Sequence, residues 1–288
     1  TRMYHLLYNT YGKNETIQWI DKFISTGIRG GLGNEHFKLG HVKILIDGST
    51  SGPSCSTKLP YCHDPNLKGI QLYTQEEADE VLIKAHNAGY NVTAHAVGDA
   101  AVEVVVTAIE KAIAQNPRPC RHRIEHCGLT DENLLNRIAA AGIVPISNPG
   151  FFNENAEAYV KYYGDRVNSM FPLKSYRDKG IITALGSDAP VIEADPMIGI
   201  YSAMVRADKR SGVVAGEDQK VGLLDAIRMY TYNGAYASLE EDIKGSIEPG
   251  KLADMAVLSE DILSTPTDRI KSIKVDMTIL DGKIVFER

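Results

Sequence analysis

Three consecutive stretches decide the fold: YNVTAHAVGD (90–99), AAVEVVVTAIEKAIAQ (100–115) and RHRIEHCG (121–128). The first and third are short apolar runs typical of buried strands, and the second has the apolar spacing of a helix, so together they predict one parallel βαβ unit. His95 and His126 stand at the downstream ends of the two predicted strands. Because ligands and catalytic groups collect at the carboxyl ends of parallel strands, we expect the two imidazoles to face one shared space.

The same alternation of strand and helix extends over most of the chain. Further strands are expected at residues 2–8, 41–47, 143–147 and 181–188, which gives six strand–helix units. A closed (β/α)8 TIM barrel has eight. We therefore predict an α/β fold of the barrel type that is incomplete, with about six of the eight units. Either the sheet is open, or two units lie outside this chain.

Two long stretches are predicted to be loops, namely residues 48–69, rich in Ser, Gly and Pro, and the aromatic residues 148–172. A loop of this length in a compact domain is usually a lid or a binding loop. The tail has short alternating strands and a turn at Asp281-Gly282, which predicts a separate antiparallel sheet with a hairpin. Helices are expected at residues 15–25, 74–87 (with Thr74 and Glu77 as a capping box), 99–115, 131–141, 173–179, 196–208 and 223–237.

The composition bounds the class of protein. With 288 residues, 43% of them hydrophobic, the chain can bury a large core. A net charge of -6 with interspersed signs favours neither a nucleic acid nor an anionic membrane as partner, and no stretch approaches the roughly 20 apolar residues of a membrane helix. Four cysteines without a CxxC pair fit reduced thiols in the cytoplasm. A zinc site made by Cys55, Cys62 and His63 is an alternative whose spacing matches no standard site.

A second group of polar residues joins the two histidines. In the strand HVKILID (41–47), alternation places Lys43 and Asp47 on one face, and Asp188 ends its strand as His95 and His126 end theirs. Singly, each has a structural alternative: the histidines as hydrogen-bonded core residues, Asp188 as a helix N-cap, and Lys43 as a partner of Asp47. Their joint placement favours a site, since an unpaired buried charge costs several kcal/mol.

Other polar residues are expected to support this site or to lie away from it. His122 shares a predicted strand face with His126 and is interpreted as a core residue or as a support for the ligands, and Asp99 as a helix-start cap that contacts His95. Asp47 is a further candidate for support or for substrate contact. The remaining interpretations are a structural ion pair between Arg123 and Glu125, surface or loop positions for His41, His63 and His86, and a role for Tyr159, Tyr162 and Tyr163 either in a substrate pocket or in packing the loop on the barrel.

Five stretches, in this order, carry a family resemblance: VKILIDGS, AHAVGDAA, HRIEHC, ALGSDAPV and EPGKLADMAVLS. They resemble the metal-dependent amidohydrolase superfamily, and specifically its YtcJ-like branch, which includes N-substituted formamide deformylases. The resemblance runs from about residue 40 to the C-terminus and implies a (β/α)8 barrel with a small β-sandwich made from both chain ends. It divides the chain into a barrel part with the catalytic site (1–244) and part of the composite sandwich (245–288).

The resemblance also implies a metal site. Lys43 matches a lysine that is often carboxylated to bridge two metals, His95 and His126 match metal ligands, and Asp188 matches an aspartate that binds metal and moves the proton. The expected cofactor is one or two divalent ions, zinc first, which lower the pKa of bound water from about 15.7 to about 7. Buried lysines can lose ~3–5 pKa units, which would make a neutral Lys43 amine available for reaction with carbon dioxide.

The implied function is hydrolysis of a non-peptide C–N bond in a small amide, formamide or cyclic amide. The family's first-strand His-x-His pair has no counterpart, which indicates a chain that lacks its N-terminal part. The alternative is a non-catalytic small-molecule-binding remnant of the same fold, or an inactive fragment of a larger hydrolase. An incomplete barrel exposes strand edges and apolar surface, so we expect a homo-oligomer or association with a missing fragment.

Overall fold

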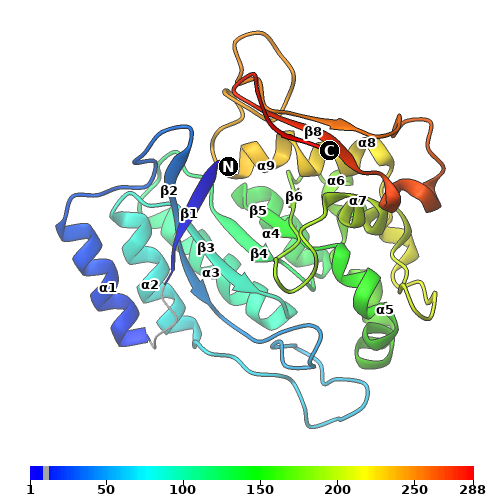
Figure 1. Cartoon of the computed structure of the whole chain (residues 1–288). Coiled ribbons are helices and arrows are strands. Elements are labelled where there is room, and N and C mark those ends of the chain that lie inside the picture. Colours follow the sequence, from blue (N-terminus) through cyan, green and yellow to red (C-terminus); the bar gives the residue numbers. More distant parts are fainter. Residues whose placement is uncertain (9–12) are drawn as a thin grey trace.

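A computed structural model of the chain describes residues 1–8 and 13–288. Its largest element is a six-stranded sheet in which neighbouring strands are all parallel and follow the chain in order, so β1 and β6 form the two edges (Figure 1). The prediction of an incomplete α/β barrel is confirmed. The strands are β1 (Met3–Tyr8), β2 (Phe37–Leu45), β3 (Val92–Ala96), β4 (Arg123–His126), β5 (Val144–Ser147) and β6 (Ala184–Leu185).

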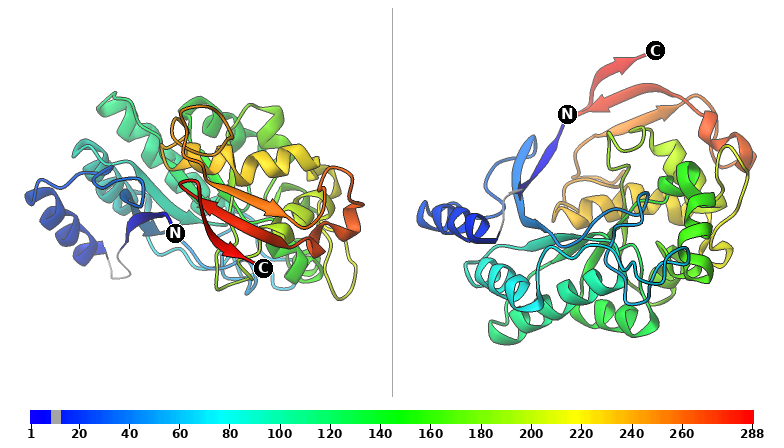
Figure 2. Two further views of the ribbon diagram at one scale, coloured as in Figure 1. Left: turned by 45° about the horizontal axis from the view of Figure 1, so that its top comes forward. Right: turned by 90° about the horizontal axis from the view of Figure 1, so that it is seen from below.

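Helices cover the outer side of the curved sheet, with α1 to α4 in a row (Figure 2). Helix α2 begins as its sequence predicts: the Thr74 hydroxyl accepts from the Glu77 N–H, and the Glu77 side chain accepts from the Thr74 N–H. The helix expected at 223–237 is two helices, because the backbone breaks at Thr231. The bounds are α1 (Lys13–Ser25), α2 (Gln75–Asn87), α3 (Asp99–Gln115), α4 (Glu132–Ala141), α6 (Leu173–Asp178), α7 (Pro196–Val205), α8 (Leu223–Tyr230) and α9 (Tyr232–Ala237), with short 3-10 helices η2 (Glu217–Gln219) and η3 (Thr267–Ser272).

The expected loop at 148–172 is wrong, because most of it is helical. Helix α5 (Gly150–Tyr163) and the 3-10 helix η1 (Gly164–Ser169) occupy the stretch. Phe152, Ala156, Tyr159 and Tyr163 recur at intervals of four, three and four residues and are all buried. That spacing is one face of a helix. The last strand is also shorter than expected, since β6 has two residues instead of eight.

The two faces of the sheet differ in polarity. Toward the helices, Ile44, Ala94 and Ile124 are fully buried in the main apolar core. The opposite face carries Lys43 beside Thr93, and His95 beside Glu125, as register partners on neighbouring strands. Branched apolar residues usually fill the interior of a closed barrel, so a charged interior marks this face as the one that holds the site.

The C-terminal tail forms the predicted antiparallel sheet of β7 (Met255–Leu258), β8 (Val275–Leu280) and β9 (Lys283–Glu287). Asp281 and Gly282 both have positive φ, as a tight hairpin turn requires. Arg2, just before β1, donates to Asp254 at 2.5 Å and to Asp281, which fixes this sheet beside the first strand (Figure 2). None of the helices in the described part of the chain is long and apolar enough to span a membrane.

Candidate metal centre

A pocket of about 200 Å³ opens at the carboxyl end of the sheet. His95, His126 and Asp188 line it together with Thr50, Phe151 and Tyr159. The ring centroids of His95 and His126 lie 4.5 Å apart with the rings nearly perpendicular. Three residues that are far apart in sequence therefore share one space.

His95 is the last residue but one of β3 and has a defined tautomer. Its Nε2 lies 2.9 Å from the Gly48 carbonyl oxygen and 3.4 Å from Asp47 Oδ1. A carbonyl oxygen only accepts, so Nε2 carries the proton and Nδ1 keeps its lone pair. Burial, aided by the neighbouring His126, lowers the pKa of His95 to about 4. The imidazole is neutral near pH 7, the form that binds metals.

His126 reaches the pocket through an unusual backbone conformation. Strand alternation would place it on the face of Ile124, toward the helices, but His126 and Cys127 have φ of 72° and 46° and end the strand. The ring lies next to His95, and its Nδ1 is 2.8 Å from Oδ1 of Asn148. Burial lowers the pKa of His126 as well. Left-handed backbone at non-glycine residues costs of order 1–3 kcal/mol and clusters at functional sites.

Asp188 lies three residues beyond β6, with φ of 59°, on an exposed segment at the pocket mouth. Partial desolvation raises the pKa of its carboxyl, against the opposing electrostatic effects of Lys43 and His95. It is not a helix N-cap, because Asp195 caps α7. In the described residues, the ligating atoms of Asp188 and the two imidazoles do not all lie within 4.8 Å of one another.

Lys43 lies deeper, with its Nζ 5.4 Å from the centroid of the Tyr8 ring. Its charge acts on His95, on Asp188 and on Glu125. No ion pair joins Lys43 to Asp47 among the described residues. Lys43 thus lies on the same face of the sheet as His95 and influences three charged or titratable groups there, but it does not line the pocket.

Asp47 is held by backbone groups. Its carboxylate accepts hydrogen bonds from the N–H groups of Ser56, Val97 and Gly98, at 2.8–3.0 Å. Burial raises the pKa of Asp47 to about 7, against the opposing effect of these hydrogen bonds. Asp47 therefore ties the 48–70 segment to the end of β3 and contacts His95.

Asp99 and His122 are not brought to the pocket. Asp99 is the first residue of α3, after the Gly98 N-cap, and its Oδ1 accepts from the Lys58 N–H at 2.9 Å. It holds the 48–70 segment and makes no hydrogen bond to His95. His122 lies before β4, at the opposite end of the strand, where its partners are His86 and the Val92 N–H.

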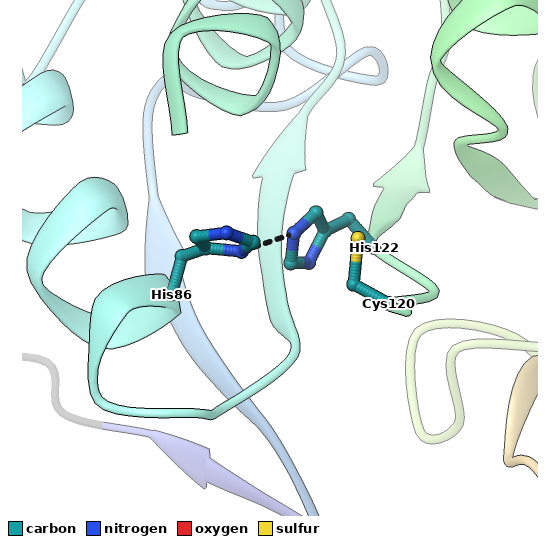
Figure 3. Close-up of side chains that lie close together, drawn as sticks. All are labelled: His86, Cys120 and His122. Atoms are coloured by element: carbon teal, nitrogen blue, oxygen red, sulfur yellow. Dashed lines mark hydrogen bonds between the residues drawn. The ribbon is translucent and has the colours of Figure 1, made fainter. Parts of the chain in front are cut away.

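His41 and His86 are fully buried, so the expected surface positions are wrong, whereas His63 is exposed as predicted. His86, Cys120 and His122 form the one group of three in the described residues whose ligating atoms lie within 4.8 Å of one another (Figure 3). His86 Nε2 donates to the Asn116 carbonyl, so its Nδ1 accepts from Nε2–H of His122 at 2.9 Å.

The hydrogen bonds of His86 and His122 occupy the ring nitrogens that a metal ion would need. The Val92 N–H donates to Nδ1 of His122, so the ring proton resides on Nε2, the nitrogen that would have to bind the ion. The pair is a structural link between α2 and β4. The alternative zinc site is also unsupported: the Cys55 thiol contacts the hydroxyls of Tyr61 and Tyr163, while Cys62 is exposed.

Two residues were not predicted to support the site, namely Glu125 and Asn148. The ion pair of Arg123 with Glu125 is confirmed at 2.5 Å, but it lies on the inner face beneath the site, where Thr93 also donates to Glu125. The charges of Arg123 and Lys43 outweigh burial and lower the pKa of Glu125. The signal was two charged residues alternating around a buried Ile124. Asn148, which holds His126, gave no signal beyond that of a turn residue.

The tyrosines divide between both expected roles. Tyr159 lines the pocket, and its hydroxyl lies 3.0 Å from the Thr50 hydroxyl. Tyr163 is buried behind it and donates to the Thr50 carbonyl. Tyr162 is partly buried against the apolar cluster that contains Tyr159 and Tyr163.

The sequence of the chain is similar to those of known amidohydrolases. Residues 9–286 match the amidohydrolase family. The chain is 32% identical to the putative amidohydrolase YtcJ of Bacillus subtilis, over 89% of this chain and 49% of that protein. It is 28% identical to the N-substituted formamide deformylase of Arthrobacter pascens, over 96% of this chain and 49% of that protein.

A solved structure shares the fold. An uncharacterized metal-dependent hydrolase from Pyrococcus horikoshii superposes with a TM-score of 0.72 at 28% identity, over 82% of this chain and 47% of that one. The chain thus spans about half the length of the relatives it matches.

Proposed function

Because the chain belongs to the amidohydrolase family, we propose that the protein is a metal-dependent hydrolase that cleaves a non-peptide C–N bond in a small amide, formamide or cyclic amide. The observation that carries the proposal is the pocket itself. Two neutral imidazoles lie 4.5 Å apart between ring centroids, each with one nitrogen committed to a protein acceptor and the other left with its lone pair. Asp188 lines the same pocket.

These donors fit a divalent metal ion. Neutral imidazole nitrogen and carboxylate oxygen are the ligands that zinc takes in hydrolases, and Lys43, His95, His126 and Asp188 would hold it. A bound ion supplies the nucleophile, by lowering the pKa of water from about 15.7 to about 7. We propose zinc, as one or two ions. We also propose a carboxylated Lys43 as a further ligand, because its stretch VKILIDGS resembles the family segment that carries such a lysine.

Asp188 would move the proton. Its carboxylate lines the pocket beside the two imidazoles, and a positioned carboxylate can accept and donate protons during a reaction. It would take the proton of the attacking water and pass it to the leaving nitrogen. Phe151 and Tyr159 form walls of the pocket, and the cavity of about 200 Å³ favours small substrates.

The test is hydrolysis of a panel of N-substituted formamides, cyclic amides and esters by the purified protein supplied with zinc. Asp188→Asn should lower kcat by about 10²–10⁴-fold, the usual contribution of a general acid–base group. Asp195→Asn is the matched control, since Asp195 caps α7 on the same segment but does not line the pocket. A protein that binds the metal and hydrolyses nothing would favour the non-catalytic binding protein instead.

We also propose that copies of the chain associate through the open edges of the sheet. Met3 on β1 and Phe37 on β2 are exposed apolar residues at one edge, and unpaired strand edges readily accept another strand. Light scattering that shows a stable monomer would refute this. Four free cysteines support a reducing compartment such as the cytoplasm.

A further inference from the structure

Asn148 joins two parts of the candidate site that come from different strands. It directly follows β5 and is 3% exposed. Its Oδ1 lies 2.8 Å from Nδ1 of His126, and its Nδ2 donates to the Gly186 carbonyl at 2.8 Å. Gly186 is two residues before Asp188. One buried amide thus contacts one candidate ligand and the segment that carries another.

The two hydrogen bonds fix each other. The Gly186 carbonyl can only accept, so the amide must turn its NH₂ group toward Gly186 and its oxygen toward His126. That oxygen can only accept, so His126 must carry its proton on Nδ1. Nε2 is then left with its lone pair.

We propose that Asn148 is a positioning residue that sets the tautomer of His126 and ties it to the segment of Asp188. The inference rests on the proposed metal site. Ring nitrogens of metal-bound histidines usually donate to an outer acceptor, and loss of such an acceptor typically weakens metal binding 10–100-fold.

The tie to Gly186 matters because β6 is short. Ala184 and Leu185 pair with β5, the Gly186 N–H donates to the Ser147 carbonyl, and from Asp188 onward the chain is exposed as far as residue 191. The hydrogen bond from Asn148 to the Gly186 carbonyl holds this segment two residues before Asp188. Because the same side chain also accepts from His126, one buried amide influences the distance between His126 and Asp188.

The first measurement needs no variant. In the metal-free protein with ¹⁵N-labelled histidine, NMR shifts of the imidazole nitrogens report which one is protonated. His126 should be the Nδ1–H tautomer. Finding the Nε2–H tautomer overturns the inference, whatever the activity of the protein.

The second measurement is metal affinity, by competition with a chelator, with zinc and with cobalt. Asn148→Leu should weaken binding 10–100-fold and shift the cobalt absorption spectrum. Asn148→Asp keeps an acceptor for His126 but sets a second oxygen against the Gly186 carbonyl. It should hold affinity within a few-fold while amide exchange at residues 184–188 becomes faster.

Asn233 supplies the matched control. It is a buried asparagine on α9 whose Nδ2 donates to the Thr183 carbonyl at 2.9 Å, just before β6, and it does not line the pocket. Asn233→Leu should leave metal affinity unchanged. Equal affinity in Asn148→Leu and wild type overturns the inference alone, and a protein with the predicted affinities but no hydrolysis refutes the proposed function alone. A wild type that binds no metal refutes both.

Discussion

Replacing Gly98 with alanine should separate the 48–70 segment from the end of β3. A Cβ at this position would lie 1.8 Å from the Ser56 carbonyl oxygen and 2.4 Å from its carbon, both backbone atoms that cannot rotate away. Contacts under 3.0 Å are essentially never seen, so the segment must move by about 1.2 Å. That motion pulls on three hydrogen bonds: Gly98 N–H and Ser56 N–H to Asp47, and Ala100 N–H to Ser56.

The expected loss of stability follows from these contacts. Overpacking costs typically about 1–3 kcal/mol, and each lost hydrogen bond about 0.5–1.5 kcal/mol. Movement of the segment relieves the overpacking but weakens the hydrogen bonds, so the two costs do not add in full. We expect Gly98→Ala to lower the free energy of unfolding by about 2–4 kcal/mol. Metal affinity should fall as well, because the same segment supplies the Gly48 carbonyl that orients His95.

Urea unfolding and chelator competition on Gly98→Ala would measure both effects. Gly52→Ala is the control, since Gly52 lies in the same segment and a Cβ there meets nothing within 4 Å. If Gly98→Ala unfolds at the wild-type urea concentration with unchanged metal affinity, the close approach of this segment to β3 is not what holds the site.

Two further predictions concern the core. Burial, with the adjacent His86, lowers the pKa of His122 to about 3, whereas an unfolded histidine has a pKa of about 6.5. The unfolded chain therefore takes up a proton as the pH falls below about 6.5, and stability drops over that window, by about 2 kcal/mol at pH 5. Urea unfolding at pH 7 and pH 5 should show that His122→Gln loses less stability between the two pH values than wild type does. If the variant and wild type lose the same amount, the buried histidine pair is not held neutral. Phe152 is fully buried and stacks its ring under the Arg206 guanidinium at 3.9 Å. Phe152→Ala should lose about 3–5 kcal/mol, whereas Val160→Ala, on the exposed side of α5, should change little, and similar unfolding midpoints for the two variants would refute the helical packing of this stretch.

The parallel sheet was predictable because short stretches rich in apolar and β-branched residues alternate along the chain with stretches of helical spacing. The apolar run that contains His95 stops at Gly98, and Gly98 is the N-cap of α3. The start of α2 was equally clear, because Thr74 and Glu77 satisfy each other's backbone N–H groups. Local chemistry decides such boundaries, and it can be read without the fold.

The helix α5 was missed because aromatic and polar residues obscure its period. Phe152, Ala156, Tyr159 and Tyr163 carry the helical spacing, but the Pro-Gly start and the Asn and Glu residues between them resemble a loop. The helix forms because these four side chains pack into one buried aromatic cluster. Tertiary packing of this kind has no local signal.

The candidate site divides in the same way. His95, His126 and Asp188 were placed by their positions after strands, and they line one pocket; their role as ligands stays a prediction. The positive φ of His126 and the support from Asn148 depend on neighbouring strands and could not be read from alternation. The inward direction of Glu125, by contrast, follows from ordinary alternation around the buried Ile124.

The most direct test of a metal centre at the mouth of the sheet is the metal content of two matched histidine variants. His95 and His86 each donate a hydrogen bond from Nε2 to a backbone carbonyl. His95 lines the pocket, whereas His86 pairs with His122 away from it. After saturation with zinc and removal of free metal, His95→Gln should retain far less zinc than wild type, and His86→Gln should retain the wild-type amount. Loss of zinc from His86→Gln with full retention in His95→Gln would place the metal elsewhere and contradict the account.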